Sequence, residues 1–176
     1  IYGIDYGSID PTCQPCKIET AFCFHGDQEN RTFLNSILKK SGGNFDIIID
    51  LDVSSPLRKD MDIKKALNKF LKEGSSNLIT GCIARKNPYF NMIEIKNKTV
   101  SLSKNIGKKI LSRQLSPKVF DMNASIYIWK RNYLLKTDNL FSKKTSFYEM
   151  PFNRSVDIDD QDDLRIVKLF LKNEKK

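Results

Sequence analysis

The chain has 176 residues, 40% of them apolar, so it is long enough to bury the core of one ordinary globular domain. Its 30 Lys and Arg residues outnumber 21 acids and give a net charge of +9, which favours an anionic partner without choosing between nucleic acid, a membrane surface and a phosphorylated small molecule. No stretch reaches the roughly 18 apolar residues of a membrane span, and the first residues lack the pattern of a signal peptide, so we expect a soluble, cytoplasmic protein.

The first part of the chain has no clear hydrophobic period. Residues 1–30 bring glycines and prolines close together, which predicts a loop-rich segment. Cys13 and Cys16 have the spacing of half a zinc site, but no second pair of this kind follows, so we interpret the cysteines as free thiols in a reducing compartment. Apolar residues at helical spacing then predict a helix that begins near Arg31 and ends at the glycines of 41–43.

A strand, a helix and a second strand are predicted next. Residues 45–51 are almost continuously apolar and β-branched, as in a strand that is buried on both faces of an α/β sheet. Asp60 or Asp62 can cap a helix that ends at Gly74, and a second strand is expected over 78–83.

The rest of the chain continues the α/β pattern. Two alternating runs within 91–102, on either side of the polar turn 96–98, predict a hairpin that projects from the sheet. Further strands are expected over 125–129 and 146–150, and a last helix over 161–171.

The first candidate site follows the buried strand. Ser54, Ser55 and Arg58 lie where this strand ends, the position at which open α/β sheets bind ligands. Their hydroxyl groups and forked guanidinium could hold phosphate or base oxygens. The alternative is that the serines only end the strand and that Arg58 is a solvated surface charge.

The second candidate site contains two alternating carboxylates. If this segment is extended, Asp157 and Asp159 project from one face while Ile158 turns into the core. Such a pair suits Mg²⁺, which takes one or two carboxylates and completes its shell with water and substrate phosphates. The alternative, that acids here complement the dipole of the last helix, explains Asp162 and Asp163 better than metal binding does.

A third group lies between these two sites. Arg113, followed by Gln114, could pair with a substrate carboxylate. Asn123 and Tyr127 are expected on one face of a strand, from which they could bind hydroxyl or amide groups. Taken singly, each residue also fits a surface or core position.

In this order, the segments resemble the CMP-N-acetylneuraminate (CMP-sialate) synthetase family. The similarity runs from about Asp27 to Leu169, and the pairing of Ser-Pro-Leu-Arg with Ser-x-Asp-Ile-Asp is its most specific part. The segments that carry the resemblance are Asp46 to Arg58, Asn87 to Asn91, Arg113 and Gln114 with Pro117, Asn123 to Tyr127, and Ser155 to Asp159.

The resemblance implies a Rossmann-like α/β domain, with a mixed, mostly parallel sheet and flanking helices. It implies transfer of CMP from CTP to a nine-carbon 2-keto sugar acid (sialic, legionaminic or deaminated neuraminic acid), with release of pyrophosphate and with Mg²⁺ on Asp157 and Asp159. It also implies a homodimer held by a protruding hairpin element within 88–120, so that Arg113 serves the partner's site. The implied sugar-acid pocket consists of Arg113, Gln114, Asn123, Tyr127 and Phe141, and the implied nucleotide side of Ser54, Ser55 and Arg58.

One family feature has no counterpart in the sequence. Members begin with a basic, Gly-rich nucleotide loop of the type Arg-x-Gly-Ser-Lys, and we therefore interpret residues 1–176 as a single, N-terminally truncated domain. A non-catalytic sugar-nucleotide-binding remnant, or a fragment of such an enzyme, is the alternative function. A basic nucleic-acid-binding protein ranks third, because the lysines are scattered and no nucleic-acid motif occurs.

Overall fold

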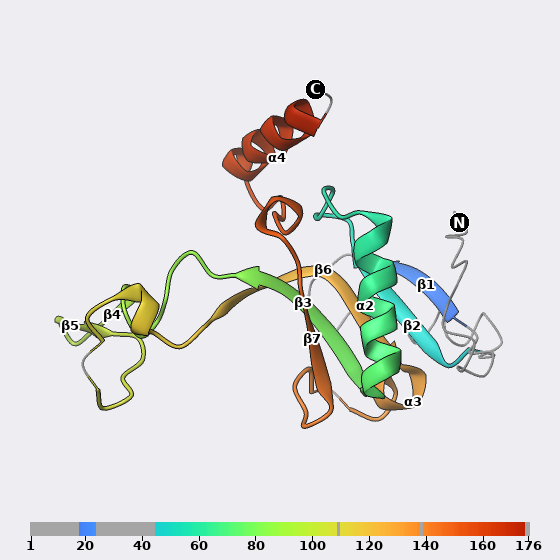
Figure 1. Cartoon of the computed structure of the whole chain (residues 1–176), viewed down its shortest axis with the longest axis horizontal. Coiled ribbons are helices and arrows are strands. Elements are labelled where there is room, and N and C mark those ends of the chain that lie inside the picture. Colours follow the sequence, from blue (N-terminus) through green and yellow to red (C-terminus); the bar gives the residue numbers. More distant parts are fainter. Residues whose placement is uncertain (1–17, 24–44, 109, 138, 175–176) are drawn as a thin grey trace.

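The structure, a computed structural model, describes residues 18–23, 45–108, 110–137 and 139–174. The strands of these residues form one five-stranded sheet, in the order β1-β2-β6-β3-β7, and a separate β4-β5 hairpin (Figure 1). In chain order the elements are β1 (Ile18–Cys23), β2 (Ile47–Asp52), α2 (Asp60–Glu73), β3 (Asn77–Ile83), β4 (Ile93–Lys96), β5 (Thr99–Leu102), η1 (Arg113–Leu115), β6 (Phe120–Lys130), α3 (Arg131–Leu134), β7 (Thr145–Glu149), η2 (Phe152–Arg154) and α4 (Gln161–Glu174).

The sheet is mixed, with one strand reversed. β1 pairs with β2 and β3 pairs with β7 in parallel, whereas β6 is antiparallel to both of its neighbours, β2 and β3. The predicted mixed, mostly parallel sheet is confirmed. The predicted strand, helix and strand are present as β2, α2 and β3. In the sheet, β6 lies between β2 and β3.

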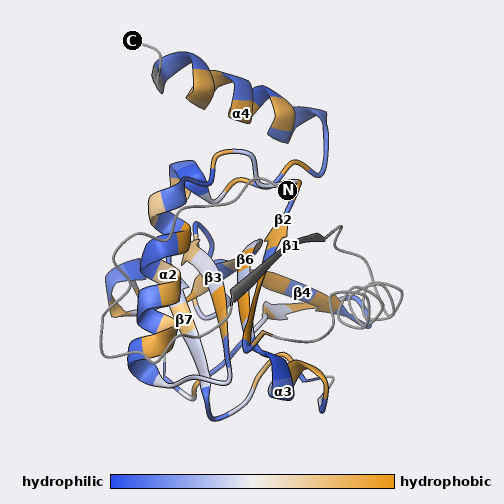
Figure 2. Ribbon diagram, turned by 90° about the vertical axis from the view of Figure 1, so that its right-hand side faces the viewer, coloured by the Kyte–Doolittle hydropathy of each residue, from blue (hydrophilic) through white to orange (hydrophobic). Residues whose placement is uncertain are grey.

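The main core lies between the sheet and α2. All six residues of β2 are buried, as predicted for a strand covered on both faces. The helix presents its apolar residues at helical spacing to the sheet, where Ala66, Leu67 and Phe70 are at most 1% exposed. Figure 2 shows hydrophobic colouring on β2, while hydrophilic and hydrophobic stretches alternate along α2.

The two ends of α2 are fixed by different groups. Gly74 closes the helix with a φ of 62°, a conformation that favours glycine, as the sequence predicts. At the start, neither Asp60 nor Asp62 is the cap residue, since Lys59 occupies that position. The Asp62 carboxylate instead accepts the Lys59 backbone N–H at 3.1 Å, from inside the first turn. The carboxylate therefore satisfies the helix start from the third helical position.

Two smaller clusters complete the packing. On the other face of the sheet, Phe45 and Ile48 pack with Trp129 and with Leu134 of α3. A third cluster joins Leu57 and Val156 to Val167 of α4, with Ile158 and Phe170 packed against it. This third cluster is what attaches the C-terminal helix to the loop that follows β2.

Two strands differ from their predicted extents. β1 lies inside the segment that the sequence predicts as loop-rich, because its six residues carry no clear period and gain their regularity by pairing with β2. β6 begins at Phe120 instead of Ser125, with its first three residues exposed. The predicted helix near Arg31, together with Cys13 and Cys16, lies outside the described residues. Cys82 is a free thiol, as predicted, and it is buried.

Residues 88–120, which we call the arm, leave the sheet after β3 and return to it at β6. The predicted hairpin is present in it as β4 and β5, and it projects away from the sheet (Figure 1). Its turn residues Asn97 and Lys98 have φ values of 49° and 65°, which match the right-handed twist of the paired strands. Among the described residues, no helix combines the length and the apolar character that crossing a bilayer requires.

Candidate active site

The carboxyl end of β2 carries two buried carboxylates. Asp50 and Asp52 alternate with Ile49 and Leu51, so the carboxylates point away from the core beneath α2. The two aspartates are only 7% and 4% exposed. Burying charge in a strand is costly, which makes such residues candidates for a functional role.

The loop after β2 holds the first predicted site, and it meets the second one. Asp52 Oδ1 accepts the Ser54 N–H at 2.8 Å, and the buried Ser55 hydroxyl donates to Asp157 Oδ1. The Ile158 N–H donates to Ser54 O at 2.9 Å. The serine loop and the Asp157 segment, far apart in the sequence, therefore lie side by side, and Ile158 packs into the third cluster as predicted from the alternation.

The charge around Asp157 fits a divalent cation. Burial raises the pKa of Asp157 above its ordinary value, and the carboxylates of Asp52 and Asp159 raise it further, while the Ser55 hydrogen bond lowers it. In the described part of the chain, no three His, Cys, Asp or Glu side chains gather so that they could hold a metal ion by themselves. Two carboxylates with open positions are the arrangement that Mg²⁺ uses beside substrate phosphates, so the residues fit this ion.

Arg58 ties the serine loop to the middle of the sheet. Its Nη1 donates to Asp52 O at 3.0 Å and to Ser125 O at 2.5 Å, which joins the end of β2 to β6. Burial lowers the pKa of Arg58, although the surrounding carboxylates, Asp52 first among them, raise it. The alternative that Arg58 is a solvated surface charge is therefore wrong, since the residue is half-buried and bonded.

Asn123 and Tyr127 do not share a face of their strand, contrary to prediction. The register between β3 and β6 shifts between these two positions, and the bulge breaks the simple alternation along β6. Asn123 turns into the main core, where its Oδ1 accepts a hydrogen bond of 2.6 Å from Thr80 Oγ1 and its Nδ2 contacts Met150 Sδ at 3.8 Å. The amide of Asn123 is thus used inside the protein.

Tyr127 lies on the other face, with the carboxylates. It is paired with Asp50 across β2 and β6 and is 4% exposed, and its ring centroid is 6.2 Å from that of Trp129. Burial, followed by the negative charge of Asp50, raises the pKa of Tyr127 to about 12. Its hydroxyl therefore stays protonated at neutral pH, beside the group formed by Asp52 and Asp157.

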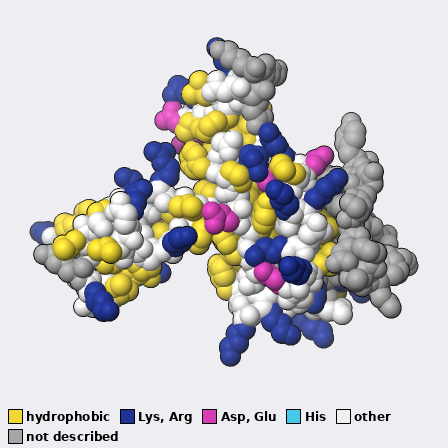
Figure 3. All heavy atoms as spheres, viewed as in Figure 1, with side chains coloured by type: hydrophobic (Ala, Val, Ile, Leu, Met, Phe, Trp, Pro, Cys, Tyr) yellow, Lys and Arg dark blue, Asp and Glu magenta, His cyan; other side chains and the backbone are white. Residues whose placement is uncertain are grey.

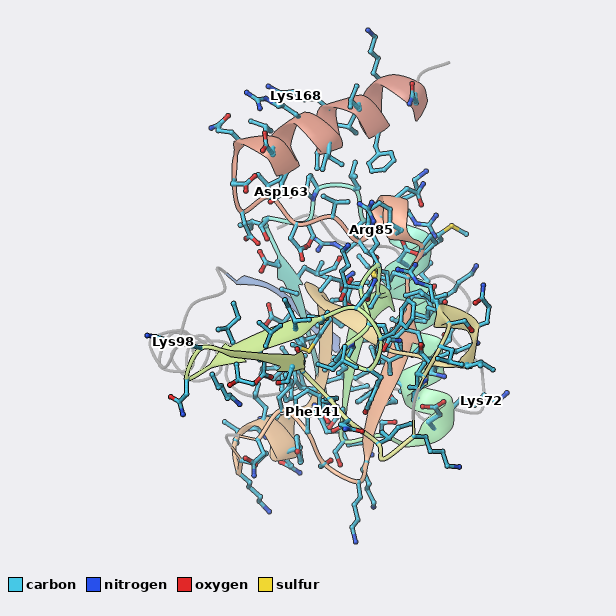
Figure 4. All side chains as sticks on the ribbon, turned by 90° about the vertical axis from the view of Figure 1, so that its left-hand side faces the viewer. Lys72, Arg85, Lys98, Phe141, Asp163 and Lys168 are labelled. Carbon is cyan, nitrogen blue, oxygen red and sulfur yellow. The ribbon has the colours of Figure 1, made fainter. Side chains whose placement is uncertain are left out.

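Three predicted residues lie apart from this group. Arg113 and Gln114 are exposed on η1 in the arm, where Arg113 Nη2 donates to Arg85 O at 2.5 Å. Phe141 is 67% exposed and precedes β7, at the opposite end of the sheet from Asp163 (Figure 4). The structure does not bring Phe141 into one pocket with Tyr127.

Sequence reasoning missed several residues that shape this site. Asp50 and Asp52 received no role, although carboxylates inside a β-branched run are a readable signal. Asp160 caps α4 by accepting the N–H groups of Asp162 and Asp163 at 2.7 and 2.9 Å. The helix-complementing role predicted for those two acids is confirmed by their place in its first turn.

One cavity of about 380 Å³ lies elsewhere, at the far end of α2. It is lined by Phe45, Asp46, Ile47, Phe70, Leu71, Gly74, Lys130, Arg131 and Asn132. None of the predicted site residues contributes to it.

Solved structures with similar architecture show the fold. The chain superposes with a TM-score of 0.56, at 14% identity, on 4-diphosphocytidyl-2C-methyl-D-erythritol synthase from Anaerococcus prevotii, covering 85% of this chain and 68% of that one. It superposes with a TM-score of 0.54, at 15% identity, on a CMP:2-keto-3-deoxy-manno-octonic acid synthetase complexed with CTP, covering 84% and 70%. The chain therefore shares the fold of these two synthases.

Curated relatives then give the family. The chain is 45% identical over 128 residues to post-translational flagellin modification protein B of Campylobacter coli, and 48% identical over 127 residues to CMP-N,N'-diacetyllegionaminic acid synthase of Campylobacter jejuni. These matches cover 73% and 72% of this chain but 54% and 53% of the relatives, so the chain spans about half their length. N-acylneuraminate cytidylyltransferase of Streptococcus agalactiae matches at 27% identity over 114 residues, covering 64% of this chain and 27% of that protein. No family model matches. Over the matched residues, the chain is thus similar to a CMP-N,N'-diacetyllegionaminic acid synthase and to an N-acylneuraminate cytidylyltransferase, which supports the family resemblance of the sequence.

Proposed function

We propose that the protein transfers CMP from CTP to a nine-carbon 2-keto sugar acid. The observation that carries the proposal is the meeting of Ser55 and Asp157 at the carboxyl end of β2, in a chain related to cytidylyltransferases. The printed name of the C. jejuni relative makes a legionaminic acid the first substrate to test, with sialic and deaminated neuraminic acids beside it.

The reaction places specific demands on these residues. The anomeric hydroxyl oxygen of the sugar acid bonds to the α-phosphorus of CTP, the bond between the α- and β-phosphates breaks, and pyrophosphate leaves as the hydroxyl proton is lost. Positioning and charge compensation supply most of the catalysis. Asp157 and Asp159 would hold Mg²⁺, which offsets the negative charge of the phosphates when bound.

The other members of the group orient the site. Ser55 holds the Asp157 carboxylate through its hydroxyl, and Arg58 fixes the loop between β2 and β6. We assign Ser54, Ser55 and Arg58 to the nucleotide side, and Tyr127 to the sugar side, where its protonated hydroxyl donates a hydrogen bond.

We further propose that the protein is a homodimer joined through the arm. Apolar side chains gather on this projecting part of the surface (Figure 3). Those most exposed are Ile93, Ile95, Val100, Leu111 and Leu115, each at least 60% exposed. Exposed apolar area of this kind marks contact surfaces. In such a dimer, Arg113 and Gln114 would reach the partner's sugar-acid carboxylate.

Replacement of Ile95 by Asp tests the dimer. We expect sedimentation velocity to show a dimer for the natural chain and a monomer for Ile95→Asp, because the buried charge would remain unpaired. Lys98→Asp, in the turn of the same hairpin, is the matched control and should remain dimeric. A monomeric natural chain would refute this part of the proposal.

Pyrophosphate release tests the activity. The natural protein is supplied with CTP, Mg²⁺ and each of the three sugar acids in turn, and we expect release that depends on all three components. Calorimetric binding of the CMP-sugar without any release would instead favour the non-catalytic alternative. If the protein neither binds the CMP-sugar nor releases pyrophosphate, the proposed function is overturned.

A further inference from the structure

A buried ion pair lies next to the proposed metal site without belonging to it. Arg154 Nε and Nη2 donate to Asp62 Oδ2 and Oδ1 at 2.8 and 2.9 Å. The Asp62 side chain is fully buried and that of Arg154 is 18% exposed. Two parallel hydrogen bonds between planar groups fix their mutual orientation as well as their distance.

The two partners belong to parts of the chain that are 92 residues apart. Asp62 is immobilised in the first turn of α2, where it also accepts the Lys59 N–H. Arg154 is the last residue of η2, directly before the segment that leads to Asp157. The ion pair therefore anchors the start of this segment to α2.

The segment has a second anchor at its other end. There the Ile158 N–H donates to Ser54 O, and Ser55 donates to Asp157. Between the anchors, the Ser155 hydroxyl donates to Pro151 O at 3.0 Å and stiffens the turn. With so few residues between two fixed ends, the position of Asp157 depends on both of them.

We propose that Arg154 is a positioning residue that, through its ion pair with Asp62, sets where Asp157 lies against Ser55. The effect on turnover rests on the proposed function, whereas the effect on the Asp157 segment does not. Arg154 acts through the placement of the carboxylate, without contact to substrate.

A double variant tests this while avoiding an uncompensated buried charge. Loss of Arg154 alone would leave the buried Asp62 carboxylate without a counter-charge and destabilise the whole fold. The variant Asp62→Asn with Arg154→Met removes both charges and keeps side chains of similar length, and the amide that replaces the carboxylate still offers an oxygen to the Lys59 N–H. Arg165→Met, which removes an exposed pair with Asp162, is the control.

Amide hydrogen exchange gives a readout that does not depend on activity. In the double variant, we expect exchange at the Ile158 N–H to accelerate at least about 10-fold, while exchange at Leu67 in the middle of α2 stays within roughly 3-fold, because only local docking is lost. In the natural protein, Mn²⁺ should broaden the Ile158 amide signal by paramagnetic relaxation, and this broadening should weaken in the double variant and persist in Arg165→Met.

Turnover provides the second readout. We expect kcat to fall on the order of 10- to 100-fold and the half-saturating Mg²⁺ concentration to rise, with the KM for CTP changed less, as for other residues that orient metal ligands. Arg154→Lys keeps the charge without the paired hydrogen bonds. Its kcat should lie between those of the natural protein and the double variant.

Two results would overturn the inference. Equal acceleration at Ile158 and Leu67 would show that the pair serves global stability only, and unchanged exchange at Ile158 would show that it does not place the segment. If the natural protein releases no pyrophosphate, the proposed function fails, and the exchange contrast still decides the role of Arg154.

Discussion

The body of the sheet and the arm place similar hydrophobic residues in opposite surroundings. In the body, Ile49, Leu67 and Ile128 are at most 1% exposed, whereas Ile95 and Val100 in the arm are 70% and 60% exposed. Both regions contain β-branched residues in strands, so composition alone does not separate them. What separates them is a second layer, since α2 covers the sheet and no described element covers the hairpin.

A two-stranded hairpin alone is only marginally stable, so the arm depends on its base. There the buried Asn87 amide donates to Pro117 O at 3.0 Å, while its N–H donates to Asn91 Oδ1 at 2.7 Å. Asn87 thus fastens the outgoing and returning ends of the arm together. The body is stabilised by packing. The arm is stabilised by the hydrogen bonds of Asn87 at its base and, in the proposed dimer, by contact with a partner.

The largest expected effect is a loss of turnover, which would place the catalytic site in the body and not in the arm. Asp157→Asn should lower kcat by about 100-fold or more, because one of two charges that hold the cation is lost. Asp162→Asn, on the exposed start of α4, is the matched control and should retain turnover. Steady-state pyrophosphate release measures both, and equal turnover in the two variants would contradict the assignment of Asp157.

A pair of alanine substitutions tests the contrast in packing. Leu67→Ala should lower the free energy of unfolding by about 2–5 kcal/mol, through lost burial and the cavity left behind. Ile95→Ala should change it by less than about 0.5 kcal/mol at a protein concentration where the chain is monomeric. Urea denaturation measures both changes. Similar losses in the two variants would mean that the arm has a packed core of its own.

Alkaline titration tests the electrostatics of the body. The pKa of Tyr127 in the folded chain is raised to about 12, so neutral tyrosine is favoured by folding. This contribution is fully present below about pH 10, the unfolded value, and is lost as pH rises towards 12. Stability should fall by at most ~3 kcal/mol across this range. In Tyr127→Phe, this fall in the free energy of unfolding between about pH 10 and 12 should disappear. The control Tyr133→Phe, at a less buried position, should keep it.

The smallest expected effect lies at the end of the chain. Asp160→Ala removes the side chain that accepts two N–H groups at the start of α4 and should cost about 1 kcal/mol. Asp159 does not cap the helix in this way, so Asp159→Ala should have little effect on thermal unfolding. If Asp159→Ala costs as much stability, Asp159 has a structural role in addition to its proposed metal role.

Much of the fold could be predicted from local patterns. β2, α2, β3, the hairpin and α4 each have a hydrophobic period or an end signal, and these elements are where the sequence places them. β1 was missed because its regularity comes from pairing with β2, which no local period records. The central place of β6 is likewise a long-range property of the sheet.

The candidate site was predicted in part. The chain order of the motifs pointed to Ser55 and Asp157, which the structure places in contact. The assumption of unbroken alternation failed for Asn123, because a bulge in β6 turns it towards the core. Asp52 and Arg154 were overlooked because their importance depends on neighbours that lie far away in the sequence.

The position of β6 has a consequence for how the chain assembles during synthesis. β2 and β3 leave the ribosome before β6, yet each of them pairs with it in the finished sheet. Until residues 120–130 emerge, both earlier strands expose hydrogen-bonding edges that can pair with other chains. Such long-range pairing also slows folding. The arm separates β3 from β6 in the sequence, so its length sets how long a nascent chain must wait before the sheet can close.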